Sequence, residues 1–192
     1  MSNNIQTDAG LNDLIPAYLD GVLQPLGKLE VHRRGLRHPA ISVFIMADDG
    51  SARTLIQRRA AGKYHTPKMW ANACCTHPHW GEDAHTAATR RVGQELGLLA
   101  LPLTHAGGQE YRADVGGALT EHEVVDIFVG HLSPDAPLPF NPAEVMAVEW
   151  VTLPDLAARI AAAPQDYTPW LQIYLAKGWG EIALRPSPQS AA

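Results

Sequence analysis

Residues 74–97 read CCTHPHWGEDAHTAATRRVGQELG and form the most informative stretch of the chain. Within it, Ala88, Val92 and Leu96 recur at intervals of four residues, which is the spacing of one buried face of a helix. Gly97 follows directly, and glycine suits the left-handed conformation in which many helices end. The pattern predicts an amphipathic helix of about 12 to 15 residues that ends at Gly97.

The segments on both sides of this helix predict β-strands. Apolar runs bounded by turn residues indicate one hairpin before the helix and a second one, around Gly116 and Gly117, after it. The predicted strands are residues 40–46, 54–57, 105–113, 122–132 and 145–153, with a long polar loop at 60–70. Two helices follow, opened by Pro154 and by Thr168 with Pro169, because proline fits the first turn of a helix. This order predicts an α/β (α+β) fold in which helices sandwich a mixed β-sheet.

Composition limits the possible classes of function. The chain has 192 residues, 46% of them hydrophobic, which predicts one domain with a sizeable core. We expect that domain at residues 12–182, between flexible tails at 1–11 and 183–192. A net charge of −5 disfavours nucleic acid and anionic membranes as partners, and no run of about 18 apolar residues could span a bilayer. The two cysteines are adjacent and cannot form a disulfide framework, so a cytoplasmic location is expected.

The charged residues of the predicted helix follow a known spacing. Glu82 lies six residues after Thr76, Arg90 eight residues further on, and Glu95 and Gly97 close the pattern. This resembles the Nudix signature, which asks for Gly, five residues, Glu, seven residues and Arg-Glu-hydrophobic-x-Glu-Glu-x-Gly. Thr76, Arg91 and Gln94 depart from it, so of the signature carboxylates only Glu82 and Glu95 remain. One helix carboxylate can hold one Mg²⁺ against a substrate phosphate, but the cluster that activates water in Nudix hydrolases is depleted.

Two glutamates and three histidines outside the helix suggest a second metal site. Glu121 and Glu123 are two residues apart at the start of a predicted strand, so they point to the same side while His122 points away. Such a carboxylate pair needs a cation or a shared proton. Together with His32, His38 and His77 they would make an N₃O₂ set suited to Mn²⁺, Zn²⁺ or Fe²⁺. From the residues alone, a structural or surface role is more common than metal binding for any single one of these histidines.

Five short motifs occur in the order found in one family. They are ANACCTHP, GQELG, YRAD, EHEVVDIF and TPW, and the match extends from about residue 28 to residue 175. Together they resemble the bacterial form of type I isopentenyl-diphosphate delta-isomerase, a Nudix-fold family. The resemblance implies a metal-dependent isomerase that interconverts isopentenyl and dimethylallyl diphosphate and supplies isoprenoid biosynthesis. The partner it implies is a small-molecule prenyl diphosphate, and it does not predict an oligomeric state.

The resemblance also implies catalytic roles. Cys75 and Glu123 would be the acid–base pair, Tyr111 would hydrogen-bond near Glu123, and Trp170 would offer its π face to a carbocation. Cys75 is chosen over its neighbour Cys74 because His77 follows two residues after the active cysteine in the family pattern. If the segment is extended, Cys74 then points the other way and is a core residue.

The remaining implied residues bind metal and diphosphate. A Mn²⁺ or Zn²⁺ site, which could also take Mg²⁺, would use His32, His38, His77, Glu121 and Glu123, although the family places its first two histidines seven apart and here they are six apart. Glu95 and the backbone carbonyl of Cys75 would hold Mg²⁺. The diphosphate would be bound by Lys28, Arg59, Lys63 and Arg91. The histidines without a ligand position are His65, His79, His85, His105, His122 and His131.

Two other functions fit a Nudix-like chain. One is a pyrophosphohydrolase of a nucleoside or prenyl diphosphate, against which Arg91 and Gln94 count because they replace carboxylates. The other is a catalytically inactive domain that binds a diphosphate as a sensor. Cys75, Glu123 and Trp170 count against the sensor, because it would need no acid–base pair.

Overall fold

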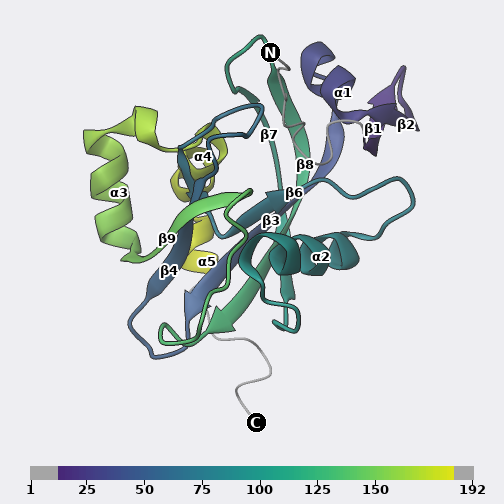
Figure 1. Cartoon of the computed structure of the whole chain (residues 1–192). Coiled ribbons are helices and arrows are strands. Elements are labelled where there is room, and N and C mark those ends of the chain that lie inside the picture. Colours follow the sequence, from purple (N-terminus) through teal and green to yellow (C-terminus); the bar gives the residue numbers. More distant parts are fainter. Residues whose placement is uncertain (1–12, 184–192) are drawn as a thin grey trace, which may run out of the picture.

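A computed structural model describes residues 13–183 of the chain. The predicted tails lie outside these residues, except for Ala183, which ends the last helix. A seven-stranded mixed sheet forms the centre of the fold (Figure 1). Its main path runs β5-β4-β3-β8-β7, with β6 paired to β3 and β9 paired to β4. The strands are β3 (His38–Ala47), β4 (Arg53–Arg59), β5 (Trp70–Asn72), β6 (Cys74–Thr76), β7 (Thr104–Asp114), β8 (Thr120–Leu132) and β9 (Val145–Thr152).

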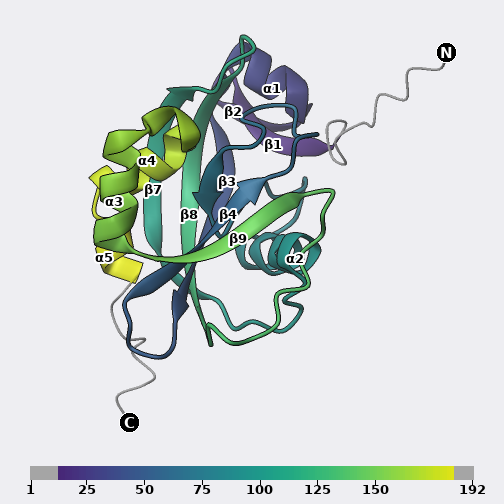
Figure 2. The same ribbon diagram turned by 60° about the vertical axis from the view of Figure 1, so that its left-hand side comes forward.

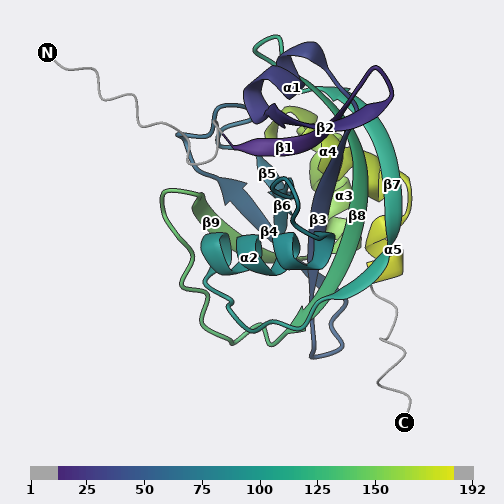
Figure 3. The ribbon, with the colours of Figure 1, turned by 90° about the vertical axis from the view of Figure 1, so that its right-hand side faces the viewer.

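Helices cover both faces of this sheet, as Figures 2 and 3 show. Helix α2 (Ala84–Leu96) lies on one face, and a buried apolar cluster that includes Val92 and Leu96 fills the space beneath it. The opposite face carries the second large cluster, which includes Leu171 and Tyr174. Its helices are α3 (Leu153–Ala162), α4 (Pro169–Ala176) and α5 (Trp179–Ala183), and a 3₁₀ turn spans Pro164–Asp166. The predicted α+β sandwich is therefore confirmed.

The long elements agree with the sequence patterns. Helix α2 begins after Asp83, whose side chain accepts a hydrogen bond from the backbone N–H of Thr86, and it ends at Gly97 with φ of 73°. The two hairpins are β3–β4 and β7–β8, and both are antiparallel. Helix α3 has Pro154 in its first turn, and helix α4 begins at Pro169. These elements are amphipathic or strongly apolar over enough residues for periodicity to identify them.

The elements that the sequence reasoning missed are short. They are β1 (Leu14–Leu19), β2 (Val22–Gly27), α1 (Lys28–Arg34), β5, β6, the 3₁₀ turn and α5. Strands β1 and β2 form a separate two-stranded sheet beside α1, at the end of the main sheet where β8 begins (Figure 3). Strand β5 starts inside the predicted loop and exists because it pairs with β4, whereas β6 pairs with β3. Three residues carry too little periodicity to show either strand. No helix among residues 13–183 is both long and apolar enough to cross a membrane.

Candidate active site and metal centre

The register of three neighbouring strands aligns the first group of site residues. His38 of β3 is paired with Glu123 of β8, and Glu123 is paired with Tyr111 of β7. Paired residues project from the same face of a sheet, so these three side chains stand in one row. The phenol of Tyr111 donates a hydrogen bond of 2.6 Å to Oε2 of Glu123. The contact expected between these two residues is therefore present.

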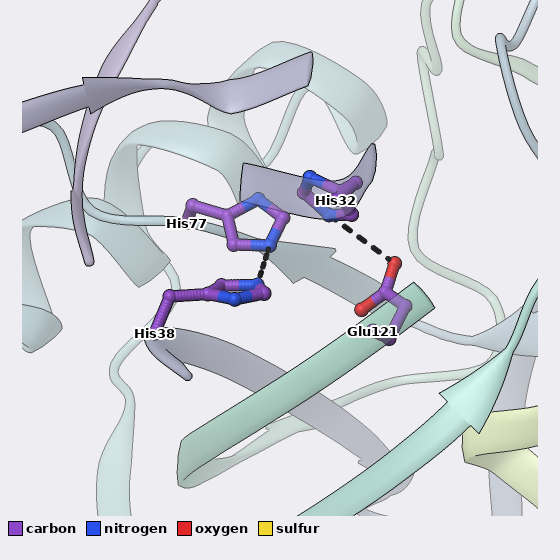
Figure 4. Close-up of side chains that lie close together, drawn as sticks. All are labelled: His32, His38, His77 and Glu121. Carbon is purple, nitrogen blue, oxygen red and sulfur yellow. Dashed lines mark hydrogen bonds and ion pairs between the residues drawn. The ribbon is translucent and has the colours of Figure 1, made fainter. Parts of the chain in front are cut away.

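Three histidines from distant parts of the chain meet beside this row. His32 of α1, His38 and His77 join Glu121 of β8, and each offers one ligand atom within 4.8 Å of the other three (Figure 4). Glu123 borders the group, with its Oε1 3.0 Å from Nε2 of His77 and 3.8 Å from Nε2 of His38. All five side chains are buried. The structure thus brings together the five residues that the family resemblance assigned to one metal site.

Backbone carbonyls orient two of these imidazoles. Nδ1 of His32 lies 2.7 Å from the carbonyl oxygen of Lys28, and Nδ1 of His38 lies 2.7 Å from that of Leu36. A carbonyl only accepts, so each Nδ1 carries the proton and each Nε2 presents a lone pair. Nε2 of His38 lies 3.2 Å from Nε2 of His77, and Nε2 of His32 lies 3.6 Å from Oε1 of Glu121. Converging imidazole lone pairs beside buried carboxylates suit a divalent transition metal, so the residues fit such an ion.

Burial and nearby charges shift the pKa values of these groups in different directions. Burial lowers the pKa of His77 well below its ordinary value. Burial also opposes protonation of His38, but contacts with Glu123 and Glu121 outweigh it and raise the pKa of His38. For Glu123, burial is outweighed by contacts with Glu121, His38 and Tyr111, which lower its pKa to about 2. Glu123 is therefore ionised at neutral pH.

The two cysteines occupy opposite environments, as an extended segment requires. Cys74 is fully buried in the core beneath α2. Cys75 is paired with Ser42 of β3 and borders a cavity of ≈ 460 Å³. Its thiol lies 3.2 Å from Oδ1 of Asn72, which accepts the hydrogen bond. Burial, followed by the charge of Glu123, raises the pKa of Cys75 to about 12, so the group is a protonated thiol at neutral pH.

The same cavity collects the other expected site residues. Glu123, Tyr111 and Trp170 border it together with Cys75. Five Lys and Arg side chains also border it, namely Arg90 and the four that were assigned to diphosphate binding: Lys28, Arg59, Lys63 and Arg91. The guanidinium of Arg59 lies 5.3 Å from the centre of the Trp170 ring. One cavity is thus bordered by a thiol, an ionised carboxylate, an aromatic ring and a cluster of positive charge.

Two of the cations at the cavity, Lys63 and Arg91, contact two buried carboxylates. Glu95 of α2 forms ion pairs with Arg91 and, at 3.8 Å, with Lys63, and it accepts a 2.8 Å hydrogen bond from Gln57. These charges outweigh burial and lower the pKa of Glu95. Glu144 contacts the same two cations, with 3.2 Å to Arg91. Because Glu95 already has cationic partners, it would bind Mg²⁺ most readily when an anionic ligand attracts Lys63 and Arg91.

The other signature carboxylate, Glu82, does not border the cavity. Its two oxygens accept hydrogen bonds of 2.8 Å from Arg90, and one of them also accepts from the backbone N–H of His79. The Arg90 contacts, reduced by partial burial, lower the pKa of Glu82. Glu82 therefore links Arg90 of helix α2 to the backbone of His79, in the segment that precedes the helix.

Comparisons with known proteins show to which family the chain belongs. The family profile described as NUDIX domain matches residues 36–171. A protein of Cereibacter sphaeroides named isopentenyl-diphosphate Delta-isomerase is 55% identical over 167 residues, which cover 87% of this chain and 93% of the relative. A relative of the same name from Jannaschia is 56% identical over 163 residues, covering 85% and 91%. The chain belongs to the isopentenyl-diphosphate Delta-isomerase family.

Solved structures place this isomerase family member among Nudix folds. A crystal structure from Deinococcus radiodurans matches with a TM-score of 0.66 and 18% identity, covering 90% of this chain and 99% of the other. The Nudix hydrolase RenU from M. smegmatis matches with a TM-score of 0.56 and 19% identity, covering 79% and 89%. At these identities the likeness concerns the fold alone.

Two buried residues of this family member were missed from the sequence. Glu144 contacts Lys63 and Arg91, and His65 borders the cavity with its Nε2 3.3 Å from Oε1 of Glu121. Burial lowers the pKa of His65 well below its ordinary value. His65 lies in the predicted polar loop and Glu144 lies in an irregular segment before β9, so no periodicity marked either. His122, in contrast, points away from the site as expected and lies 3.3 Å from Glu110.

Proposed function

We propose that this protein interconverts isopentenyl diphosphate and dimethylallyl diphosphate. The observation that carries the proposal is that Cys75 and Glu123 border one cavity together with Trp170 and a cluster of Lys and Arg side chains. Membership of the isomerase family, whose curated relatives carry that activity in their names, supports it. In this proposal Lys28, Arg59, Lys63 and Arg91 bind the diphosphate, which places the short hydrocarbon chain toward Cys75 and Glu123.

The reaction moves a double bond and needs two proton transfers. One proton is added to the terminal CH₂ of the substrate, which leaves a tertiary carbocation, and another is removed from the adjacent methylene. We assign these transfers to the Cys75 thiol and the Glu123 carboxylate. Tyr111 holds the carboxylate in place through its 2.6 Å hydrogen bond. The ring of Trp170, which is 3% exposed, helps to exclude water and offers a π face to the cation.

Two metal sites complete the proposal. His32, His38, His77, Glu121 and Glu123 would hold Mn²⁺ or Zn²⁺, and Glu95 with the backbone carbonyl of Cys75 would hold Mg²⁺ at the diphosphate. A bound divalent ion supplies fixed positive charge beside the carboxylates and the phosphate oxygens. Tyr111 could still hold Glu123 when an ion is bound, because Tyr111 contacts Oε2 of Glu123 whereas His77 contacts Oε1. We also propose a cytoplasmic location, for which the two free cysteines are the support.

One assay separates this function from hydrolysis. The protein is incubated with isopentenyl diphosphate and Mg²⁺, with and without Mn²⁺ or Zn²⁺, and the mixture is examined for dimethylallyl diphosphate and for released phosphate. We expect the allylic isomer and no phosphate. Phosphate without isomer would favour the pyrophosphohydrolase, and binding without either product would favour a sensor.

A further inference from the structure

A fourth buried histidine lies against the candidate metal centre. His65 is 7% exposed, and its Nε2 lies 3.3 Å from Oε1 of Glu121. The same carboxylate oxygen lies 3.6 Å from Nε2 of His32. We propose that His65 is a positioning residue, which packs against Glu121 and holds this carboxylate against the three metal-facing imidazoles. The inference rests on the metal centre of the proposed function.

Both ring nitrogens of His65 have polar neighbours, because Nδ1 lies 3.0 Å from the hydroxyl oxygen of Thr66 and Nε2 faces Glu121. A carboxylate that binds a metal ion can only accept, so in the proposed metal-bound state Nε2 would carry the proton and Nδ1 would accept from the Thr66 hydroxyl. These contacts restrict the orientation of the ring. His65 is not one of the four residues whose ligand atoms converge within 4.8 Å, so we assign it to Glu121 and not to the ion.

The backbone around His65 is held in an unusual conformation. Thr66 has φ of 45°, a left-handed value that a β-branched residue rarely adopts. Such a backbone costs about 1–3 kcal/mol and persists where its surroundings hold it. Here the buried guanidinium of Arg59 donates to the carbonyl oxygens of His65, at 3.2 Å, and of Thr66, at 3.3 Å. The loop is thus fixed at the point where it directs His65 into the cavity.

Ring contacts complete the support of His65. Its ring is stacked 5.9 Å from that of His32 and lies edge-on to Trp170 at 5.8 Å. A histidine in this place limits the motion of Glu121, whereas His38 and His77 contact Leu36 and Glu123 instead. Partners that orient a metal-binding carboxylate or imidazole change metal affinity by about 10–100-fold when they are removed.

The test measures metal affinity directly. The full chain and its variants are titrated with Mn²⁺ and Zn²⁺ in competition with a chromophoric chelator. We expect His65→Ala to bind about 10–100-fold more weakly. His65→Gln keeps an N–H donor and should recover part of this loss. His122→Ala is the matched control, because His122 lies next to Glu121 in sequence but faces Glu110, and it should bind like the unaltered protein.

The outcomes distinguish this inference from the function beneath it. Unchanged metal affinity in a folded His65→Ala variant, checked by thermal unfolding, would overturn the positioning role. So would a change in the visible spectrum of the Co²⁺-saturated variant as large as that of His77→Ala, because it would make His65 a direct ligand. Failure of the unaltered protein to bind Mn²⁺, Zn²⁺ or Co²⁺ would overturn the proposed metal centre itself, and the role of His65 with it.

Discussion

At the scale of single residues, the alternation of side chains along a strand determines which residues face the cavity and which pack in the core. Cys74 and Cys75 are neighbours, yet the first is 0% exposed beneath α2 and the second borders the cavity. The same alternation sends Glu121 and Glu123 to the site and His122 to the other side of β8. One-residue differences in register therefore decide which side chains can act on a substrate.

The cysteine pair gives a prediction at this scale. Cys75→Ala should lower kcat by about 10²–10⁴-fold, because it removes a proton-transfer group. Cys74→Ala should keep kcat within a few-fold and instead lower stability by about 1 kcal/mol, the usual size of a small core change. Isomerisation kinetics and chemical denaturation measure the two effects. Equal loss of activity in both variants would contradict the assignment of Cys75.

At the scale of elements, helix α2 keeps the Nudix frame with altered chemistry. Arg91 stands where the signature has a carboxylate, and it pairs with Glu95 and Glu144. Glu82 does not border the cavity, and it forms an ion pair with Arg90, which does. Helix α2 therefore carries positive and negative side chains beside the cavity, whereas the Nudix signature of the hydrolases has mainly carboxylates on this helix.

Glu82 provides the test of this view. Glu82→Gln should leave metal affinity and kcat unchanged and should lower stability by about 1 kcal/mol, because one partly buried ion pair with Arg90 is lost. The lowered pKa of Glu82 means that its contribution is present above the ordinary pKa of a glutamate and is lost as pH falls. Denaturation at pH 7 and at acidic pH measures this. Weaker Mg²⁺ or Mn²⁺ binding in the variant would instead make Glu82 a ligand.

At the scale of the whole molecule, the site joins segments that are far apart in the chain. The carboxylate of Glu144, just before β9, meets Arg91 of α2 and Lys63 of the β4–β5 loop. These side chains are mostly buried, and removing one member leaves an uncompensated charge. Glu144→Gln should lower the free energy of unfolding by about 3 kcal/mol.

A matched control for Glu144 is available on β9. Glu149 forms an exposed ion pair with Arg159, and its side chain is 37% exposed. Glu149→Gln should lower stability by less than about 1 kcal/mol, since solvent screens exposed pairs. Urea denaturation of both variants gives the comparison. Equal effects would show that the buried network does not stabilise the fold.

The metal centre likewise ties α1, β3, β8 and the chain after β6 together. A ligand that binds only the folded state stabilises it, by about 2.7 kcal/mol at a hundred times its Kd. Treatment with a chelator should therefore lower the melting temperature, and Mn²⁺ or Zn²⁺ should restore it. His38→Ala should melt at the same temperature with and without the ion. Metal-independent melting of the unaltered protein would contradict a centre built from these four segments.

The sequence by itself determined the long elements and the chemistry of the site. Helix α2, both hairpins and helices α3 and α4 were predictable, because apolar periodicity extends over many residues in each. The residues assigned to metal and diphosphate also came from the family resemblance, and the structure brings them together.

Only the tertiary structure decided the rest. Strands β5 and β6 are stabilised by their pairing with β4 and β3, and His65 and Glu144 have partners that lie 56 and 53 residues or more away along the chain. Such contacts leave no local pattern, because burial and charge pairing depend on which segments the fold brings into contact. The sequence therefore supplied the reactive groups, and long-range packing determined which additional side chains hold them in place.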